Sequence, residues 1–153
     1  MREILFRGKR KDNGEWVEGF YFCMVHDDGS HVHHFIMPLG ADLSLGTPIE
    51  KIQVEIDIET LCQYTGLTDK NGNNIWENDV VKKHFYTDYD AYANSEEYVG
   101  FVKYEDFAWV IKSPKSRMIR TFPIIEAIAY SKDVKHFEII GNTFDNADLL
   151  KGE

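Results

Sequence analysis

Hydrophobic and polar residues alternate along short stretches of this chain, and the alternation is clearest between Lys51 and Ile58. Apolar β-branched side chains there stand at every second position, at Ile52, Val54, Ile56 and Ile58. A period of two places successive side chains on opposite faces of a β-strand, so this segment predicts a half-buried strand. Helical periodicity is nowhere sustained beyond two turns. We therefore expect a mainly β protein with minor α structure.

Further strands are predicted from short apolar runs that end at turn signals. They cover residues 2–8, 16–26, 31–37, 80–85, 98–105, 107–112, 118–122 and 136–140. Residues 61–67 fit either a strand or an irregular turn, and residues 123–130 fit either a short helix or a strand. Residues 146–150 predict one helical turn with Asp145 or Asn146 as its N-cap. Many short strands with turn signals about 8–12 residues apart are typical of a barrel or a sandwich.

Glycine and asparagine mark the places where the chain reverses. Residues 69–72, Asp-Lys-Asn-Gly, contain the strongest turn signal, because glycine and asparagine tolerate a left-handed backbone. The loop at 38–48 contains two glycines and two prolines and is the best candidate for a boundary. We predict an N-terminal sheet at residues 1–48 and a second β region at 49–153. The alternative is one intertwined domain over residues 1–153.

The formal net charge of −9 disfavours non-specific binding to nucleic acid. Basic residues nevertheless gather near the start of the chain and near residue 115. The candidates for contact with an anionic partner are Arg2, Lys9, Arg10, Lys112 and Arg117. The alternative is that these side chains are solvated groups on strand edges, where lysine discourages pairing with another sheet.

The two cysteines, Cys23 and Cys62, match no zinc or redox motif, so we expect two reduced and mostly buried thiols. The first ten residues contain no apolar segment typical of a signal peptide. No apolar run approaches the roughly 18 residues that a membrane span needs. These features predict a soluble, cytoplasmic protein.

Histidines form one group with possible chemistry. If Asp28 and Gly29 form a two-residue hairpin loop, then His26 lies opposite His31, and the register pairs Met24 with His33 and Cys23 with His34. His26, His31 and His33 then share one face, where three imidazoles can bind zinc. The alternatives are exposed hairpin histidines without a ligand and a pH-sensitive contact.

No motif in the sequence predicts catalysis. Gly66 and Gly72 do not form a phosphate-binding loop, because no Gly-Lys-Ser/Thr follows them. No serine or cysteine stands in a nucleophile elbow. We therefore expect no enzymatic activity and no cofactor.

Three stretches resemble the signatures of the YopX-like phage protein family. They are Q-Y-T-G-L-T-D-K-N-G-N-N-I-W-E-N-D-V-V at residues 63–81, F-E-I-I-G-N-T-F-D-N-A-D-L-L at 137–150 and R-E-I-L-F-R-G at 2–8. They lie at both ends and in the middle, so the resemblance spans the whole chain. Asn78 stands where the family usually has glycine, which is a mild change because asparagine also tolerates a left-handed backbone. Other departures are Trp76 for tyrosine, Asp145 for glutamate and Ala147 for proline.

The resemblance implies a phage or prophage protein of bacteria, with no catalytic residue to carry over. It also implies an SH3-like β-barrel that begins near residues 77–79, and self-association. We interpret the conspicuous positions of the two longer stretches as structural turn residues. They are Thr65, Gly66, Asp69, Asn71, Gly72, Glu77, Asn78, Asp79, Gly141 and Asn142.

The leading hypothesis is therefore a non-enzymatic phage-encoded protein that binds protein partners or itself. A second hypothesis is a nucleic-acid-binding accessory factor of phage replication or regulation, supported by the local basic groups. A third is a metal-dependent hydrolase that uses the histidine-rich hairpin.

Overall fold

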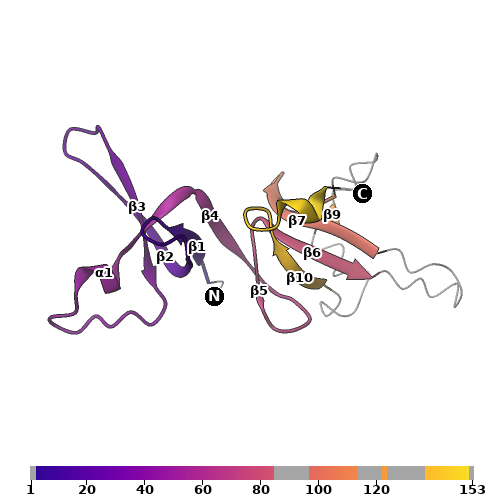
Figure 1. The fold of residues 1–153 in the computed structure, drawn as a ribbon, viewed down its shortest axis with the longest axis horizontal. Coiled ribbons are helices and arrows are strands. Elements are labelled where there is room, and N and C mark those ends of the chain that lie inside the picture. The colour runs from indigo at the N-terminus through magenta and orange to yellow at the C-terminus, as the bar shows by residue number, and fades with distance from the viewer. Residues whose placement is uncertain (1–2, 85–96, 114–121, 124–136, 152–153) are drawn as a thin grey trace, which may run out of the picture. The chain divides into compact units, whose positions relative to one another are not determined.

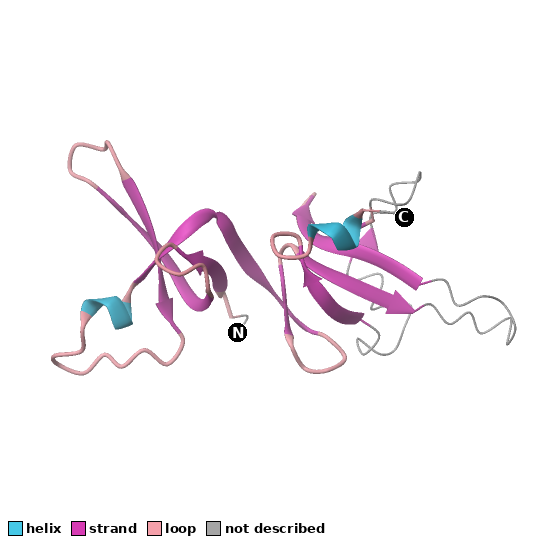
Figure 2. Cartoon of the chain, in the orientation of Figure 1, coloured by secondary structure: helices cyan, strands magenta, loops and turns pink. Residues whose placement is uncertain are grey.

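The computed structural model describes residues 3–84, 97–113, 122–123 and 137–151 (Figure 1). Helical structure in these residues is confined to α1 (Ile49–Ile52) and the 3₁₀ helix η2 (Ala147–Leu150), as Figure 2 shows. All other regular elements of the described part are antiparallel strands, so the expected mainly β fold is confirmed. Neither short helix has the length or the hydropathy that a membrane crossing requires.

The chain divides into two compact units, Met1–Tyr64 and Thr65–Glu153. The sequence placed a boundary at residues 48 and 49 instead, in the loop that contains the glycines and prolines. The difference arises because residues 54–63 pair with the strands that precede that loop. Glycine and proline therefore mark a long connection inside the first unit.

Four strands build the first unit: β1 (Phe6–Arg10), β2 (Trp16–Val25), β3 (Val32–Pro38) and most of β4 (Val54–Thr68). Each pairs with the next in antiparallel fashion, and β1 also pairs with β4. Strand β1 begins four residues later than the predicted strand at 2–8. The buried apolar side chains of this unit are Leu5, Ile36, Val54, Ile56, Cys62 and Tyr64.

Strand β4 joins two segments that the sequence left separate, because residues 61–67 continue the strand. Residues 51–52 belong to α1 instead, where the Gln53 amide donates to the Ile49 carbonyl over 2.8 Å. Ile58 is exposed, contrary to the alternation, because the ladder with β1 is irregular beside it. The Thr60 hydroxyl there donates to the Asp57 carbonyl and accepts from the Lys9 amide.

The second unit contains β5 (Asn74–Trp76), β6 (Asp79–His84), β7 (Glu97–Glu105), β8 (Ala108–Lys112), β9 (Phe122–Pro123) and β10 (Phe137–Asn142). Five of them form an antiparallel sheet in the order β10-β6-β7-β8-β9, while β5 pairs with the end of β4. Its core is made of Ile75, Val81, Val102, Ile111 and Phe137. Of the strand predicted at 118–122 and the segment at 123–130, only residues 122–123 lie inside the described part.

The turn between β7 and β8 holds two residues other than glycine in the left-handed region, Asp106 (φ 48°) and Phe107 (φ 65°). Two consecutive positive φ values are typical of a type I′ hairpin turn, which favours asparagine or aspartate followed by glycine. Asp106 suits its position. Phe107 does not, and its side chain is 96% exposed, so no packing offsets the backbone cost.

We expect the Phe107→Gly variant to be more stable than the natural protein by about 0.5–1 kcal/mol, because glycine removes the left-handed penalty and exposed phenylalanine loses no burial. Urea denaturation measures the difference. The Asp106→Asn variant is the matched control and should stay within about 0.5 kcal/mol, since asparagine also suits this turn. A Phe107→Gly variant less stable than the natural protein would contradict this account of the turn.

Candidate functional site

The turn after β4 is organised around the carboxylate of Asp69, which is only 5% exposed. One carboxylate oxygen accepts hydrogen bonds from the amides of Asn71 (2.8 Å) and Asn73 (2.9 Å). The other accepts from the Asn73 side chain (3.2 Å) and from the amide of Ile139 in β10 (3.3 Å). Gly72, with φ 85°, allows the reversal. The carboxylate therefore shapes a local turn and ties it to a strand about 70 residues away.

Burial alone raises the pKa of the Asp69 carboxyl, but the hydrogen bonds from Asn73, Ile139 and Asn71 outweigh it and lower the pKa below the ordinary value. Asp69 is thus held as a carboxylate whose oxygens are occupied by donors. It is poorly suited to move a proton for a substrate.

The turn between β5 and β6 depends on Asn78 and Asp79. Asn78 has φ 64°, as its replacement of glycine suggested, and its amide donates to the Val102 carbonyl over 2.8 Å. Asp79 is 1% exposed and accepts a hydrogen bond from the Trp76 amide over 2.8 Å. Glu77 lies 3.6 Å from the Lys103 ammonium group. This turn too is held by backbone contacts.

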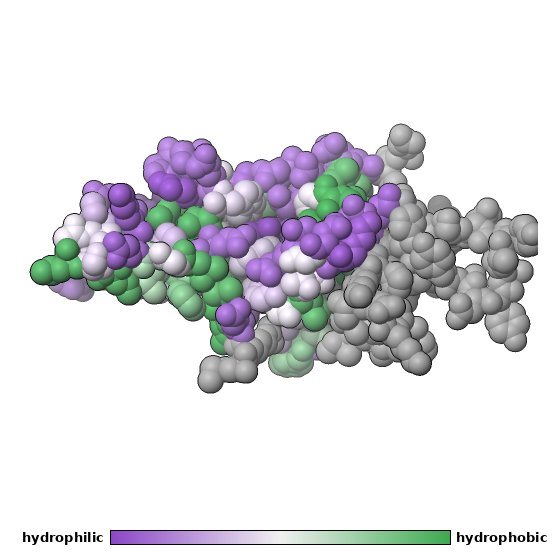
Figure 3. Space-filling model, turned by 90° about the horizontal axis from the view of Figure 1, so that it is seen from below, coloured by the Kyte–Doolittle hydropathy of each residue, from purple (hydrophilic) through white to green (hydrophobic). Residues whose placement is uncertain are grey.

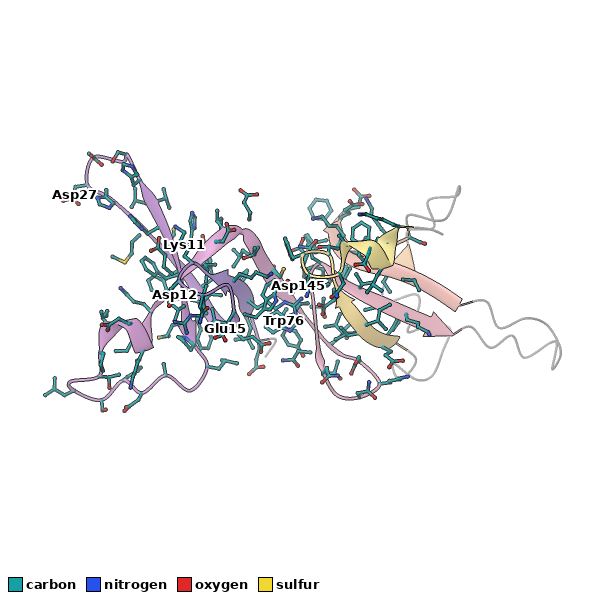
Figure 4. All side chains as sticks on the ribbon, viewed as in Figure 1. Lys11, Asp12, Glu15, Asp27, Trp76 and Asp145 are labelled. Atoms are coloured by element: carbon teal, nitrogen blue, oxygen red, sulfur yellow. The ribbon has the colours of Figure 1, made fainter. Side chains whose placement is uncertain are left out.

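Asn142 and Gly141 shape the end of the chain. The Asn142 side-chain oxygen accepts from the amides of Phe144 and Asp145, the latter labelled in Figure 4. The Asn146 side chain caps no helix; it accepts from the Asn142 amide instead. A β-carbon on Gly141 would lie 2.4 Å from that Asn146 oxygen, which explains the glycine.

Thr65 completes the set of turn residues. Its buried hydroxyl donates to the Ile75 carbonyl over 2.7 Å and accepts from the Leu67 amide, while Gly66 between them has φ 85°. All ten residues lie in the second unit, and Thr65 and Gly66 lie inside strand β4 rather than at a turn. The contacts described for these residues shape the backbone.

The histidine-rich hairpin has the predicted register, with Cys23 opposite His34 and Met24 opposite His33. Figure 4 labels Asp27 in its connecting turn. The Nε2 atoms of His26 and His33 lie 3.2 Å apart, and the His31 ring lies 5.8 Å from the His26 ring. Among the described residues, no group of three or more His, Cys, Asp or Glu side chains is arranged to hold a metal ion.

One partner of this hairpin was missed by sequence reasoning. The Glu55 carboxylate in β4 lies 2.9 Å from Nδ1 of His33, although the two residues are 22 positions apart in the sequence. Only the pairing of β3 with β4, which sets Phe35 opposite Glu55, brings it there. Cys23, on the other face of the hairpin, is exposed rather than buried as expected, while Cys62 is buried.

The basic candidates that fall within the described residues already have partners. Arg10 pairs with Asp12 over 2.6 Å, Lys9 lies over the Trp16 ring, and Lys112 pairs with Glu105. Arg2 and Arg117 lie outside the described residues.

Two units built from antiparallel strands define this chain as a mainly β protein. A sequence model described as "YopX protein" matches residues 5–151, nearly the whole length. The chain therefore belongs to the YopX protein family, as the resemblance of its three stretches indicated.

A solved structure agrees with this assignment at the level of the fold. The crystal structure of protein EF1440 from Enterococcus faecalis is similar with a TM-score of 0.54 and 21% identity, over 99% of this chain and 100% of that one. Identity this low shows a shared fold alone. No curated protein matches the chain.

The Asp69→Asn variant should lose about 1–3 kcal/mol of unfolding free energy at pH 7, because an amide cannot accept all four hydrogen bonds. The folded pKa of Asp69 is lowered, so its contribution is full above the unfolded pKa and is lost as pH falls through the folded value. The natural protein should therefore lose stability in acid more steeply than the variant. Urea denaturation from pH 7 to pH 2 measures both slopes.

The control is Asp148→Asn, which removes the same charge from an exposed residue of the same unit. It should change stability by less than about 0.5 kcal/mol at any pH. Equal stability of Asp69→Asn and the natural protein at pH 7 would refute the role assigned to this carboxylate.

Proposed function

We propose that this protein is a non-enzymatic, phage- or prophage-encoded binding protein that acts in the host cytoplasm through contacts with protein partners or with a second copy of itself. Membership of the YopX protein family supports the assignment of origin through the resemblance described above. Binding is supported by exposed apolar side chains that reduce stability and bury little surface among the described residues.

Phe107 is the observation that carries the proposal. Its ring is 96% exposed at the tip of the β7–β8 hairpin, and its backbone has the left-handed φ of 65°. Strained backbone in exposed turns concentrates at functional positions. Large aromatic side chains are also the commonest anchors of protein interfaces, since each buries much apolar area with few rotatable bonds. A partner with an apolar pocket would compensate for both costs.

Exposed apolar side chains also gather in the first unit, in the connection between β3 and β4. They are Leu39, Leu43, Leu45 and Ile49, and the left-hand part of Figure 3 shows apolar surface on this unit. Residues 38–42 and 44–48 with Lys51 surround an open hollow of about 580 Å³. Exposed apolar side chains that gather in one segment favour a protein contact.

The buried carboxylates support the absence of catalysis in this proposal. Asp69 and Asp79 are the two buried acidic residues of the described part, and backbone amides donate to both. A general acid or base needs a carboxyl group that reaches a substrate.

The proposal includes an SH3-like arrangement of the second unit. Its support is the strand order β10-β6-β7-β8-β9, in which four strands follow one another and the last returns to pair with the first. SH3-like barrels have this order. The irregular register between Ile139 and Gly141 adds a bend of the kind that curved sheets use.

Binding of nucleic acid is less well supported. Arg10 and Lys112 are paired with carboxylates, and the net charge of −9 opposes a polyanion. Binding to a protein does not require free basic side chains.

The Phe107→Gly variant separates binding from stability, because it should weaken binding while the protein becomes more stable. Sedimentation equilibrium of the full chain first tests self-association. A photoreactive phenylalanine analogue at position 107 then identifies a contacting protein in host cells, and titration of that purified protein gives its affinity.

We expect at least about a tenfold loss of affinity for Phe107→Gly, equivalent to about 1.4 kcal/mol, and no loss for Asp106→Asn, which keeps the ring. A protein that stays monomeric and forms no crosslink at position 107 would overturn the proposal. Equal affinity of Phe107→Gly and the natural protein would overturn the role of this ring.

A further inference from the structure

The β2–β3 hairpin brings two imidazoles to the same point from opposite strands. Nε2 of His26 and Nε2 of His33 lie 3.2 Å apart, and their ring centroids lie 5.2 Å apart. A contact between two ring nitrogens needs one shared proton or one shared cation, because each neutral nitrogen that lacks a hydrogen carries a lone pair. The two rings therefore present a small site between their nitrogens.

Glu55 fixes which nitrogen of His33 is available. Its carboxylate lies 2.9 Å from Nδ1 of His33 and 2.7 Å from the Lys11 ammonium group. One oxygen of this carboxylate meets both donors, the Lys11 ammonium group and the His33 ring, and a carboxylate oxygen accepts hydrogen bonds. His33 must then donate through Nδ1–H, which leaves the lone pair of a neutral ring on Nε2. That nitrogen is the one that faces His26.

We propose that His26 and His33 bind a divalent transition-metal ion through their Nε2 atoms, with Glu55 as the positioning residue of His33. Two nitrogens bound to one tetrahedral zinc ion lie about 3.3–3.4 Å apart, close to the observed 3.2 Å. Rings aimed at such an ion have centroids about 5.2 Å apart, the separation found here.

Second-sphere chemistry also fits a metal ion. A histidine ligand usually donates its other ring N–H to a carboxylate or carbonyl, which orients the ring and raises its basicity. Glu55 provides this contact for His33. Imidazole nitrogen selects zinc, nickel or copper, whereas magnesium and calcium prefer oxygen.

The arrangement leaves two positions of a tetrahedral ion open on an exposed face. Water, or a donor from another molecule, would occupy them. His31 lies on the same face, and its Nδ1 atom contacts the Ser30 hydroxyl at 2.7 Å. Its ring centroid lies 5.8 Å from that of His26, farther than the 5.2 Å between His26 and His33, so it is not assigned as a ligand.

The test is calorimetric titration of zinc chloride into the untagged full chain, in a buffer that does not bind metal. We expect one zinc ion per chain. His26→Gln and His33→Gln should each weaken zinc binding by more than about tenfold, and Glu55→Gln by about 10–100-fold. Both histidines are on the hairpin surface, and circular dichroism verifies that each variant folds.

Two controls separate this site from general effects of histidine and charge. His34→Gln removes an imidazole from the other face of the same hairpin, where it contacts the Tyr21 hydroxyl at 2.8 Å. Glu59→Gln removes a carboxylate from an exposed position on the same strand as Glu55. Both variants should bind zinc with the affinity of the natural protein.

Nitrogen NMR of the histidine rings gives a readout that a structural role would not move. Zinc should shift the Nε2 resonances of His26 and His33, while Nδ1 of His33 remains protonated. In Glu55→Gln that Nδ1 preference should weaken. Absence of zinc binding by the natural protein, or equal affinity in the His26, His33 and His34 variants, would overturn the proposal.

Discussion

The second unit depends on one buried carboxylate. Asp69 gathers two amides of its own turn, one asparagine side chain and the amide of Ile139 from the last strand. An unpaired charge with so little solvent contact would cost several kcal/mol, so these donors are a condition for burying it. Because one donor comes from β10, the turn can form fully only when the end of the chain is in place. The motif near residue 70 and the motif near residue 140 are therefore two halves of one contact.

This dependence explains why the family signature consists of turn residues. Gly66, Gly72 and Asn78 have positive φ, while Asp69 and Asp79 accept hydrogen bonds from backbone amides. Each position restricts the type of side chain for a conformational reason. The positions proposed for binding, Phe107 and the histidine hairpin, are separate from these residues. The turn residues therefore bear on the fold, and the exposed residues bear on the proposed binding.

Local pattern was sufficient for much of the fold. Apolar runs that end at turn signals predicted β2 and β3, and their short connection set the register that pairs Cys23 with His34. Turn chemistry identified residues 69–72 and the left-handed Asn78. These features are determined by residues that are close in the sequence, and the pattern of hydrophobic side chains reveals such local structure directly.

Contacts between distant segments could not be predicted in the same way. The division after Tyr64 follows from the pairing of β4 with β1 and β3, which no local pattern encodes. Glu55 meets His33 for the same reason. The strain at Phe107 was also missed, because the sequence predicted this residue as the start of the strand at 107–112.

Strand β4 has a consequence for how members of this family can exchange parts. The boundary between the two units falls inside its fifteen residues, between Tyr64 and Thr65. Gene recombination at that point would join two half-strands from different parents, and each parent's ladder of hydrogen bonds would have to continue through the junction. A crossover in the loop before α1 would keep β4 whole but would separate it from β1 and β3, with which it pairs. Either junction divides a ladder, so we expect the two units to be inherited together.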